Sequence, residues 1–123
     1  MATDREIKIV KGLLITEANK LLKKKGLNIV ITDDEVEVLT RMSITTYNAM
    51  YNDKTNIIEI KRALITQAVK EYKSNNEITD IRQTRGFNCV LALLILERGR
   101  KVHKEGFSKV LEDELIKAKI LVK

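Results

Sequence analysis

The sequence contains no proline and no tryptophan, only five glycines, and 4% aromatic residues. Folds built from many short strands need frequent glycine and proline in their turns and aromatic residues in their strands. Their scarcity here argues against a β-sandwich or a β-barrel and favours helices. At 123 residues, the chain is shorter than the roughly 150 residues typical of one domain. We therefore expect a single helical domain over residues 1–123.

The chain also has a single cysteine, Cys89, and a single histidine, His103. These two residues cannot form an intramolecular disulfide or supply the four ligands of a structural zinc site. Cys89 opens the apolar run 89–96, where we expect a buried, unreactive thiol. Adjacent carboxylates in the acidic segments 33–37 and 112–114 would point about 100° apart on a helix, and no glycine pair has the spacing of a phosphate-binding loop. We therefore predict no enzyme activity, cofactor, metal or small-molecule substrate.

Long hydrophobic runs are absent as well. The longest is 89–96, whereas a helix that crosses a bilayer needs about 20 apolar residues. Charged residues at positions 4–6 stand where a secretory signal would soon need an apolar stretch. We expect a soluble, cytoplasmic protein without a membrane partner. Its richness in lysine, isoleucine and asparagine is typical of AT-rich genomes, such as those of small phages or mobile elements.

Apolar residues in the first part of the chain recur every three or four positions: Ile7, Val10, Leu14, Ala18 and Leu21. This spacing predicts an amphipathic helix that begins at Thr3 or Asp4 and ends at Gly26. The lysine run 23–25 at its end is explained by the helix dipole, with a nucleic-acid contact as the alternative. The segment 27–31 is rich in β-branched residues, so we expect a short extended segment there, without a partner strand.

Two capping-box patterns indicate further helices. Thr32 with Glu35 predicts a helix that runs to about Asn52, with a break near Ser43, and Asn56 with Glu59 predicts a helix through Tyr72 that ends at 74–76. The apolar run then predicts a helix over 87–98 that ends at Gly99. Because this run is apolar all round, we expect its helix to be the buried centre of the fold. With a last helix from Ser108, the prediction is a mainly α, compact bundle of about five helices around 87–98.

The net charge of +6 resides entirely in the second half of the chain. Six cations surround the apolar run, with Glu97 as the only acidic residue between the first and the last of them: Arg82, Arg85, Arg98, Arg100, Lys101 and Lys104. We call these six residues the cation cluster. They suit phosphate, nucleic acid or an acidic protein face. The alternative is that they keep the ends of a very apolar helix soluble and complement its dipole.

Two functions from different classes remain. The first is a non-catalytic adaptor that self-associates or docks on a partner protein, because the apolar faces exceed what one small core needs. Its predicted interface residues are Ile58, Ile65, Tyr72, Ile120 and Val122. The alternative is a small basic nucleic-acid-binding regulator that uses the cation cluster. A helix over 87–98 is about 18 Å long and would separate the two halves of that cluster, so nucleic acid ranks second.

Overall fold

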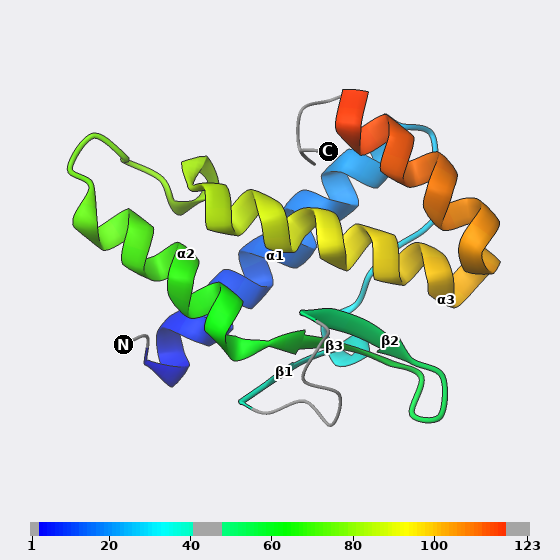
Figure 1. Ribbon diagram of the computed structural model, residues 1–123, viewed down its shortest axis with the longest axis horizontal. Helices are drawn as coiled ribbons and strands as arrows, with labels where there is room; N and C mark the ends of the chain where they lie inside the picture. The colour runs from blue at the N-terminus through cyan, green and yellow to red at the C-terminus, as the bar shows by residue number, and fades with distance from the viewer. Residues whose placement is uncertain (1–2, 41–47, 118–123) are drawn as a thin grey trace.

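The computed structural model describes the backbone of residues 3–40 and 48–117 and the side chains of residues 3–40 and 48–101. Within these residues the fold is α+β, with three α-helices, two 3₁₀ turns and a three-stranded mixed sheet (Figure 1). In chain order the elements are α1 (Asp4–Lys24), η1 (Asp33–Glu35), β1 (Val36–Leu39), β2 (Ala49–Asn52), β3 (Ile57–Lys61), α2 (Arg62–Ser74), η2 (Ile81–Gln83) and α3 (Arg85–Lys117). The predicted mainly α bundle of five helices is therefore wrong.

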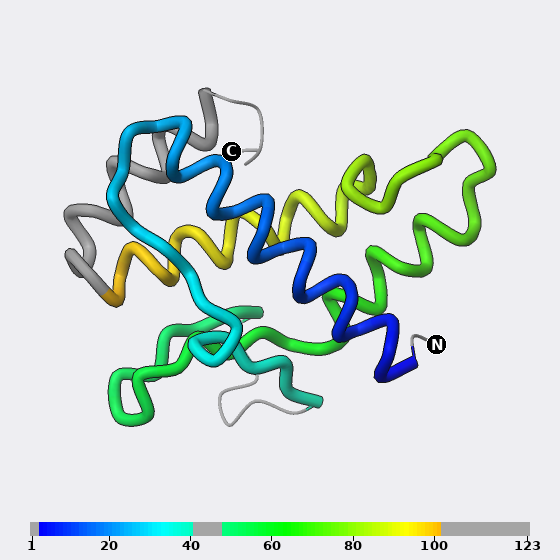
Figure 2. Tube along the Cα trace, turned by 180° about the vertical axis from the view of Figure 1, so that it is seen from behind, coloured from blue at the N-terminus to red at the C-terminus, as the bar shows by residue number. Residues whose placement is uncertain are grey.

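The helices form one layer and the sheet forms another. Figure 1 shows α1 and α3 crossing above the sheet, with α2 leading away from the end of β3. Seen from behind in Figure 2, the connector after α1 descends from the C-terminal end of that helix to the sheet. All three helices thus lie on the same side of the sheet, and the core fills the space between the two layers.

Local signals determine both ends of α1, as predicted. Thr3 and Glu6 form a reciprocal capping box: the Glu6 N–H donates to Thr3 Oγ1 (3.1 Å) and the Thr3 N–H donates to Glu6 Oε1 (3.0 Å). At the other end Gly26 has φ +74°. The Leu27 N–H then donates to Leu22 O, and the Gly26 N–H donates to Lys23 O, both at 3.0 Å. This is a Schellman motif, which needs the left-handed conformation that glycine adopts without strain.

The segment 27–31 carries neither a helix nor a strand, and a side chain of α1 holds it in place. Asn19 accepts a hydrogen bond from Ile31 N (2.8 Å) and donates one from Nδ2 to Ile31 O (3.0 Å). The Asn19 side-chain amide therefore pairs with both backbone polar groups of Ile31, as a neighbouring strand would. Ile31 is buried, with 2% of its surface exposed, so the connector closes one end of the core.

Two segments predicted to be helical form strands instead, although the later part of the helix predicted from Asn56 through Tyr72 is confirmed as α2, which ends at Ser74. The Thr32–Glu35 signal produces only the single 3₁₀ turn η1, and the segment after Asn56 forms β3. In β3 the buried Ile58 and Ile60 alternate with more exposed residues, and in β1 the exposed Glu37 separates the buried Val36 from the partly buried Val38. This period of two, together with β-branched side chains, fits a strand with one face on a core. The pairing with distant residues outweighs the local capping signals.

The strand order is β1-β3-β2, so β3 is the central strand. β1 runs parallel to β3, with Val36 beside Ile58, and β2 runs antiparallel, with Tyr51 beside Ile58. Asn56 adopts φ +64° in the turn between β2 and β3, in the left-handed region that asparagine tolerates better than most residues. The Asn56 N–H donates to Asn52 O at 2.8 Å.

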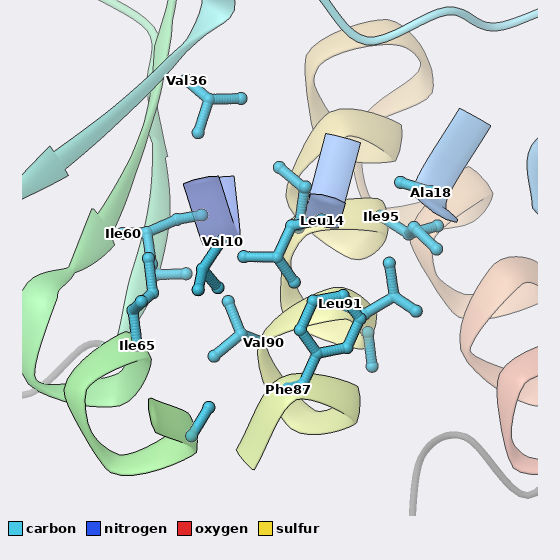
Figure 3. Packing of buried hydrophobic residues seen from close by; sticks show 14 of the residues in the cluster. Val10, Leu14, Ala18, Val36, Ile60, Ile65, Phe87, Val90, Leu91 and Ile95 are labelled. Carbon is cyan, nitrogen blue, oxygen red and sulfur yellow. The ribbon is translucent and has the colours of Figure 1, made fainter. Parts of the chain in front are cut away.

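The core draws on every layer, and Figure 3 shows side chains from the sheet and the three helices meeting there. The predicted helix 87–98 is part of α3 and contributes six buried residues: Phe87, Val90, Leu91, Ala92, Leu94 and Ile95. Its burial on all sides is wrong, however, because Cys89 is exposed and Leu93 is only partly buried. The helix also continues through Gly99 to Lys117, so there is no separate helix that starts near Ser108.

α2 and α3 pack closely against each other at Gly86. A Cβ atom at this position would lie 2.8 Å from Glu71 Oε1 and 3.0 Å from the Cα of Ala68. The same Glu71 carboxylate accepts the N–H groups of Arg85 (3.1 Å) and Gly86 (3.0 Å), which are unpaired donors in the first turn of α3. Glycine is required here because backbone and carboxylate occupy the space of a side chain.

Replacing Gly86 by alanine should lower the free energy of unfolding by about 1–3 kcal/mol, because the added methyl group forces the two helices apart. The matched control is Gly12→Ala in α1, where no atom lies within 4 Å of the new Cβ. That control should raise the free energy of unfolding by about 0.5–1 kcal/mol. Urea denaturation followed by circular dichroism measures both. The two substitutions should change the free energy of unfolding in opposite directions. If both stabilise the protein, α2 and α3 do not pack closely at Gly86.

Candidate binding site

The first part of the cation cluster is held by carboxylates of the same chain. Arg82 Nη1 lies 2.7 Å from Glu17 Oε1 in α1, and Arg82 Nε donates to Asp80 Oδ2 at 2.9 Å. The hydrogen bonds from the Arg82 side chain and from its backbone N–H lower the pKa of Asp80 to about 2. Arg85 is exposed at the start of α3. This end of the cluster therefore presents one cation, Arg85, beside an arginine that already binds two carboxylates.

The second part of the cluster fastens α3 to the start of the sheet. Lys101 Nζ donates to Glu35 Oε2, and Arg98 Nε lies 3.2 Å from the same oxygen, in an ion-pair contact without hydrogen-bond geometry. Arg98 Nη2 also donates to Val30 O at 3.3 Å. The three charged side chains are only 14–16% exposed. These cations are largely enclosed and are engaged with the fold itself.

Glu97 and Arg100 form a third contact, which closes the edge of the sheet. Glu97 Oε1 accepts the Tyr51 N–H of β2 at 2.8 Å, and Glu97 Oε2 lies 3.0 Å from Arg100 Nε. The side chain of Lys104 lies outside the described residues. Of the five cluster side chains that the structure describes, four are in ion pairs.

The cation cluster is consequently not one surface. Arg82 binds residues near the N-terminal end of α3, whereas Arg98 and Lys101 bind Glu35 beside the sheet. The 13 residues from Arg85 to Arg98 correspond to about 20 Å along a helix. The two halves of the cation cluster are therefore separated, as expected from the sequence. These residues do not form a single track that could contact successive phosphates.

The predicted interface residues are also dispersed. Ile58 and Ile65 are 0% exposed and belong to the core, because β3 and α2 turn their apolar sides towards α1 and α3. Their assignment to a docking surface is wrong. Tyr72 is 38% exposed near the end of α2. Ile120 and Val122 lie outside the described residues.

A groove between α1 and α3 brings together residues that the sequence analysis did not group. Its volume is about 290 Å³, and its lining residues are Glu17, Lys20, Leu21, Lys24, Asn88 and Leu91. The first four lie on successive turns of α1, and the last two lie one turn apart on α3. The two leucines provide apolar surface between polar groups. The sequence signal was the placement of Lys20, Leu21 and Lys24 on one side of a helix, but its meaning depends on where α3 packs.

The polar groups of the groove differ in how far they are engaged. Glu17 binds Arg82, and Lys20 Nζ lies 3.5 Å from Glu17 Oε1. Asn88 donates from Nδ2 to Arg82 O (3.0 Å) and Thr84 O (2.9 Å). Lys24 is exposed and has no carboxylate within ion-pair distance among the described side chains. Among the described side chains, the groove therefore has a neutralised end at Glu17 and a positive end at Lys24.

The Glu35 carboxyl group has a perturbed pKa. Burial on its own raises the pKa, but the hydrogen bonds from Lys101 and Thr32 N–H, together with the charge of Arg98, outweigh it and hold the pKa below the ordinary 4.5. A carboxyl group with a lowered pKa in the folded state stabilises the fold above about pH 4.5. That stabilisation is lost as the pH falls through the lowered value.

Glu35→Gln should therefore lower the free energy of unfolding by about 1–3 kcal/mol at pH 7, since two enclosed cations lose their shared anion. The difference from the parent protein should shrink when the pH is reduced from 5 to 3. Urea denaturation at several pH values measures it, with the exposed Glu77→Gln as control. A destabilisation of equal size at both ends of that pH range would show that the charge of Glu35 is not the cause.

Recognisable sites and relatives give no further guide to function. No group of three or more histidine, cysteine, aspartate or glutamate residues is placed to hold a metal ion among the described residues. No helix in that part of the chain is long and apolar enough to cross a membrane. No family model, no curated protein and no solved structure matches the chain.

Proposed function

We propose that this protein is a non-catalytic adaptor that docks on a partner protein through the groove between α1 and α3. The observation that supports the proposal is the lining of the groove, where Lys20 and Lys24 stand beside Leu21 and Leu91. A groove with apolar surface and a few polar groups along its rim is typical of a peptide-binding site.

Binding fits these residues better than catalysis does. A general base must be within hydrogen-bond reach of its substrate, but the one carboxylate in the lining, Glu17, is engaged by Arg82 and Lys20. The Asn88 amide nitrogen is likewise committed to two backbone carbonyls. The side chains that remain available are lysines and leucines, which attract and hold a ligand.

A protein partner fits better than nucleic acid. The lining contains no aromatic side chain on which a base would stack. Most described residues of the cation cluster are in ion pairs, and releasing them for phosphates would break the contacts between α3 and the sheet. Nucleic acid therefore remains the second candidate, as a ligand of the exposed lysines alone.

A partner is also favoured over self-association. The large hydrophobic side chains that are exposed in the described part of the chain are Ile9, Val30 and Tyr72, which lie on α1, the connector and α2. Obligate homodimers bury extensive apolar surface. Three residues on three different elements are a weak basis for such an interface.

The proposal predicts that peptide ligands depend on the groove. Unbiased selection from a library of displayed 16-residue peptides against the full chain should yield binders that lose most of their affinity for Lys20→Trp, since the bulky ring occupies the groove. Lys8→Trp, at another exposed position on α1, is the matched control and should bind normally. Fluorescence anisotropy measures both, once each variant is shown to melt like the parent protein.

Two outcomes would contradict the proposal. One is that the selected peptides bind Lys20→Trp and the parent protein equally. The other is tight binding of a 20-bp DNA duplex in 150 mM salt that is weakened several-fold by Arg98→Ala combined with Arg100→Ala. Sequence-independent DNA affinity that disappears near physiological salt is expected of any protein with a net charge of +6 and agrees with the proposal.

A further inference from the structure

We infer that the segment bound in the groove is an acidic amphipathic helix of the partner, with carboxylates one helical turn apart along one side of an aliphatic stripe. This inference rests on the proposed function and names the chemistry of its ligand. It follows from the shape of the groove, its charges and its apolar surface.

The shape suits a helix. The groove runs between two packed helices, and its lining residues recur at helical spacing, with Lys20 and Lys24 one turn apart beside Leu21 on α1 and with Leu91 one turn after Asn88 on α3. Helices pack when the side-chain ridge of one enters the groove between ridges of another. Recognition of a helix in a groove uses the same geometry, with anchors at i, i+3, i+4 and i+7 of the ligand.

The charges select acidic side chains. Lys20 and Lys24 are one turn apart, so their Cβ atoms are about 5–6 Å from each other, which is also the separation of carboxylates at i and i+4 of a ligand helix. The one carboxylate of the lining, Glu17, already faces Arg82 at 2.7 Å. A ligand carboxylate near Lys24 would therefore meet a cation without a competing anion among the described side chains. A basic ligand would meet repulsion along the rim.

The apolar surface selects aliphatic side chains for the face of the ligand that enters the groove. Leu91 is 6% exposed and Leu21 is partly buried, so a leucine, isoleucine or methionine of the ligand would extend the core surface that they provide. Highly charged single strands of nucleic acid have no such apolar stripe. Because the groove combines lysines with leucines, it suits an acidic amphipathic helix better than a polyanion without apolar side chains.

The test compares two 16-residue helical peptides that have the same leucine stripe and either glutamate or glutamine at the flanking positions. Measured by fluorescence anisotropy in 50 mM salt, the glutamate peptide should bind the full chain about three- to tenfold more tightly, as expected for two exposed ion pairs. The preference should shrink in 500 mM salt, because exposed charges are screened.

Variants with equal changes of charge locate the effect. Lys20→Glu combined with Lys24→Glu should abolish or invert the preference for the glutamate peptide. Lys8→Glu combined with Lys70→Glu makes the same change at two exposed positions outside the groove and should preserve most of it. Circular dichroism and melting temperature show whether each double variant is folded.

The outcomes separate this inference from the proposed function. If both peptides bind equally, and both depend on Lys20→Trp, the groove docks a protein segment but the acidic chemistry is wrong. If neither peptide binds at 1 mM while library peptides of other composition occupy the groove, the inference is again wrong and the docking function stands. If a DNA duplex binds in 150 mM salt and only the Lys20 and Lys24 charges control it, both are wrong.

Discussion

Two carboxylates, Glu35 and Glu97, tie the sheet to α3, and the arrangement of the other elements depends on them. Glu35 immediately precedes β1 and binds Arg98 and Lys101, while Glu97 accepts the Tyr51 N–H of β2. A sheet of three short strands is barely stable without a covering layer. The ion pairs and the hydrogen bond fix both edge strands relative to one helix, and the buried face of β3 then fills the space between them.

In this arrangement the two faces of α3 have different roles. The side towards the sheet uses charged residues for structure, which is why cations that suggest an anion site in the sequence are engaged by carboxylates. The side towards α1 contributes Asn88 and Leu91 to a groove whose lysines come from the other helix. The lysines that line the groove therefore come from α1, in the half of the chain that is neutral overall.

Sequence reasoning succeeded where the determining contacts are local. Both ends of α1 follow from Thr3, Glu6 and Gly26, which act within one turn of the helix. It failed for β1 and β3, because a parallel pair joins Val36 to Ile58 across the chain and no local pattern specifies that partner. The sequence does not reveal the groove as a candidate site for the same reason. Lysines at 20 and 24 are ordinary on an exposed helix, and only the packing of α3 beside Leu21 makes them the rim of a groove.

The contact between Glu97 and β2 has a consequence for solubility. An edge strand normally offers its outward N–H and C=O groups to a strand of another molecule, and such pairing starts the growth of fibrils. At Tyr51 the outward N–H already donates to a helix side chain, and the incoming strand would have to displace a carboxylate that also pairs with Arg100. The contact that orders this edge therefore also hinders the addition of a strand of another molecule to β2 at Tyr51.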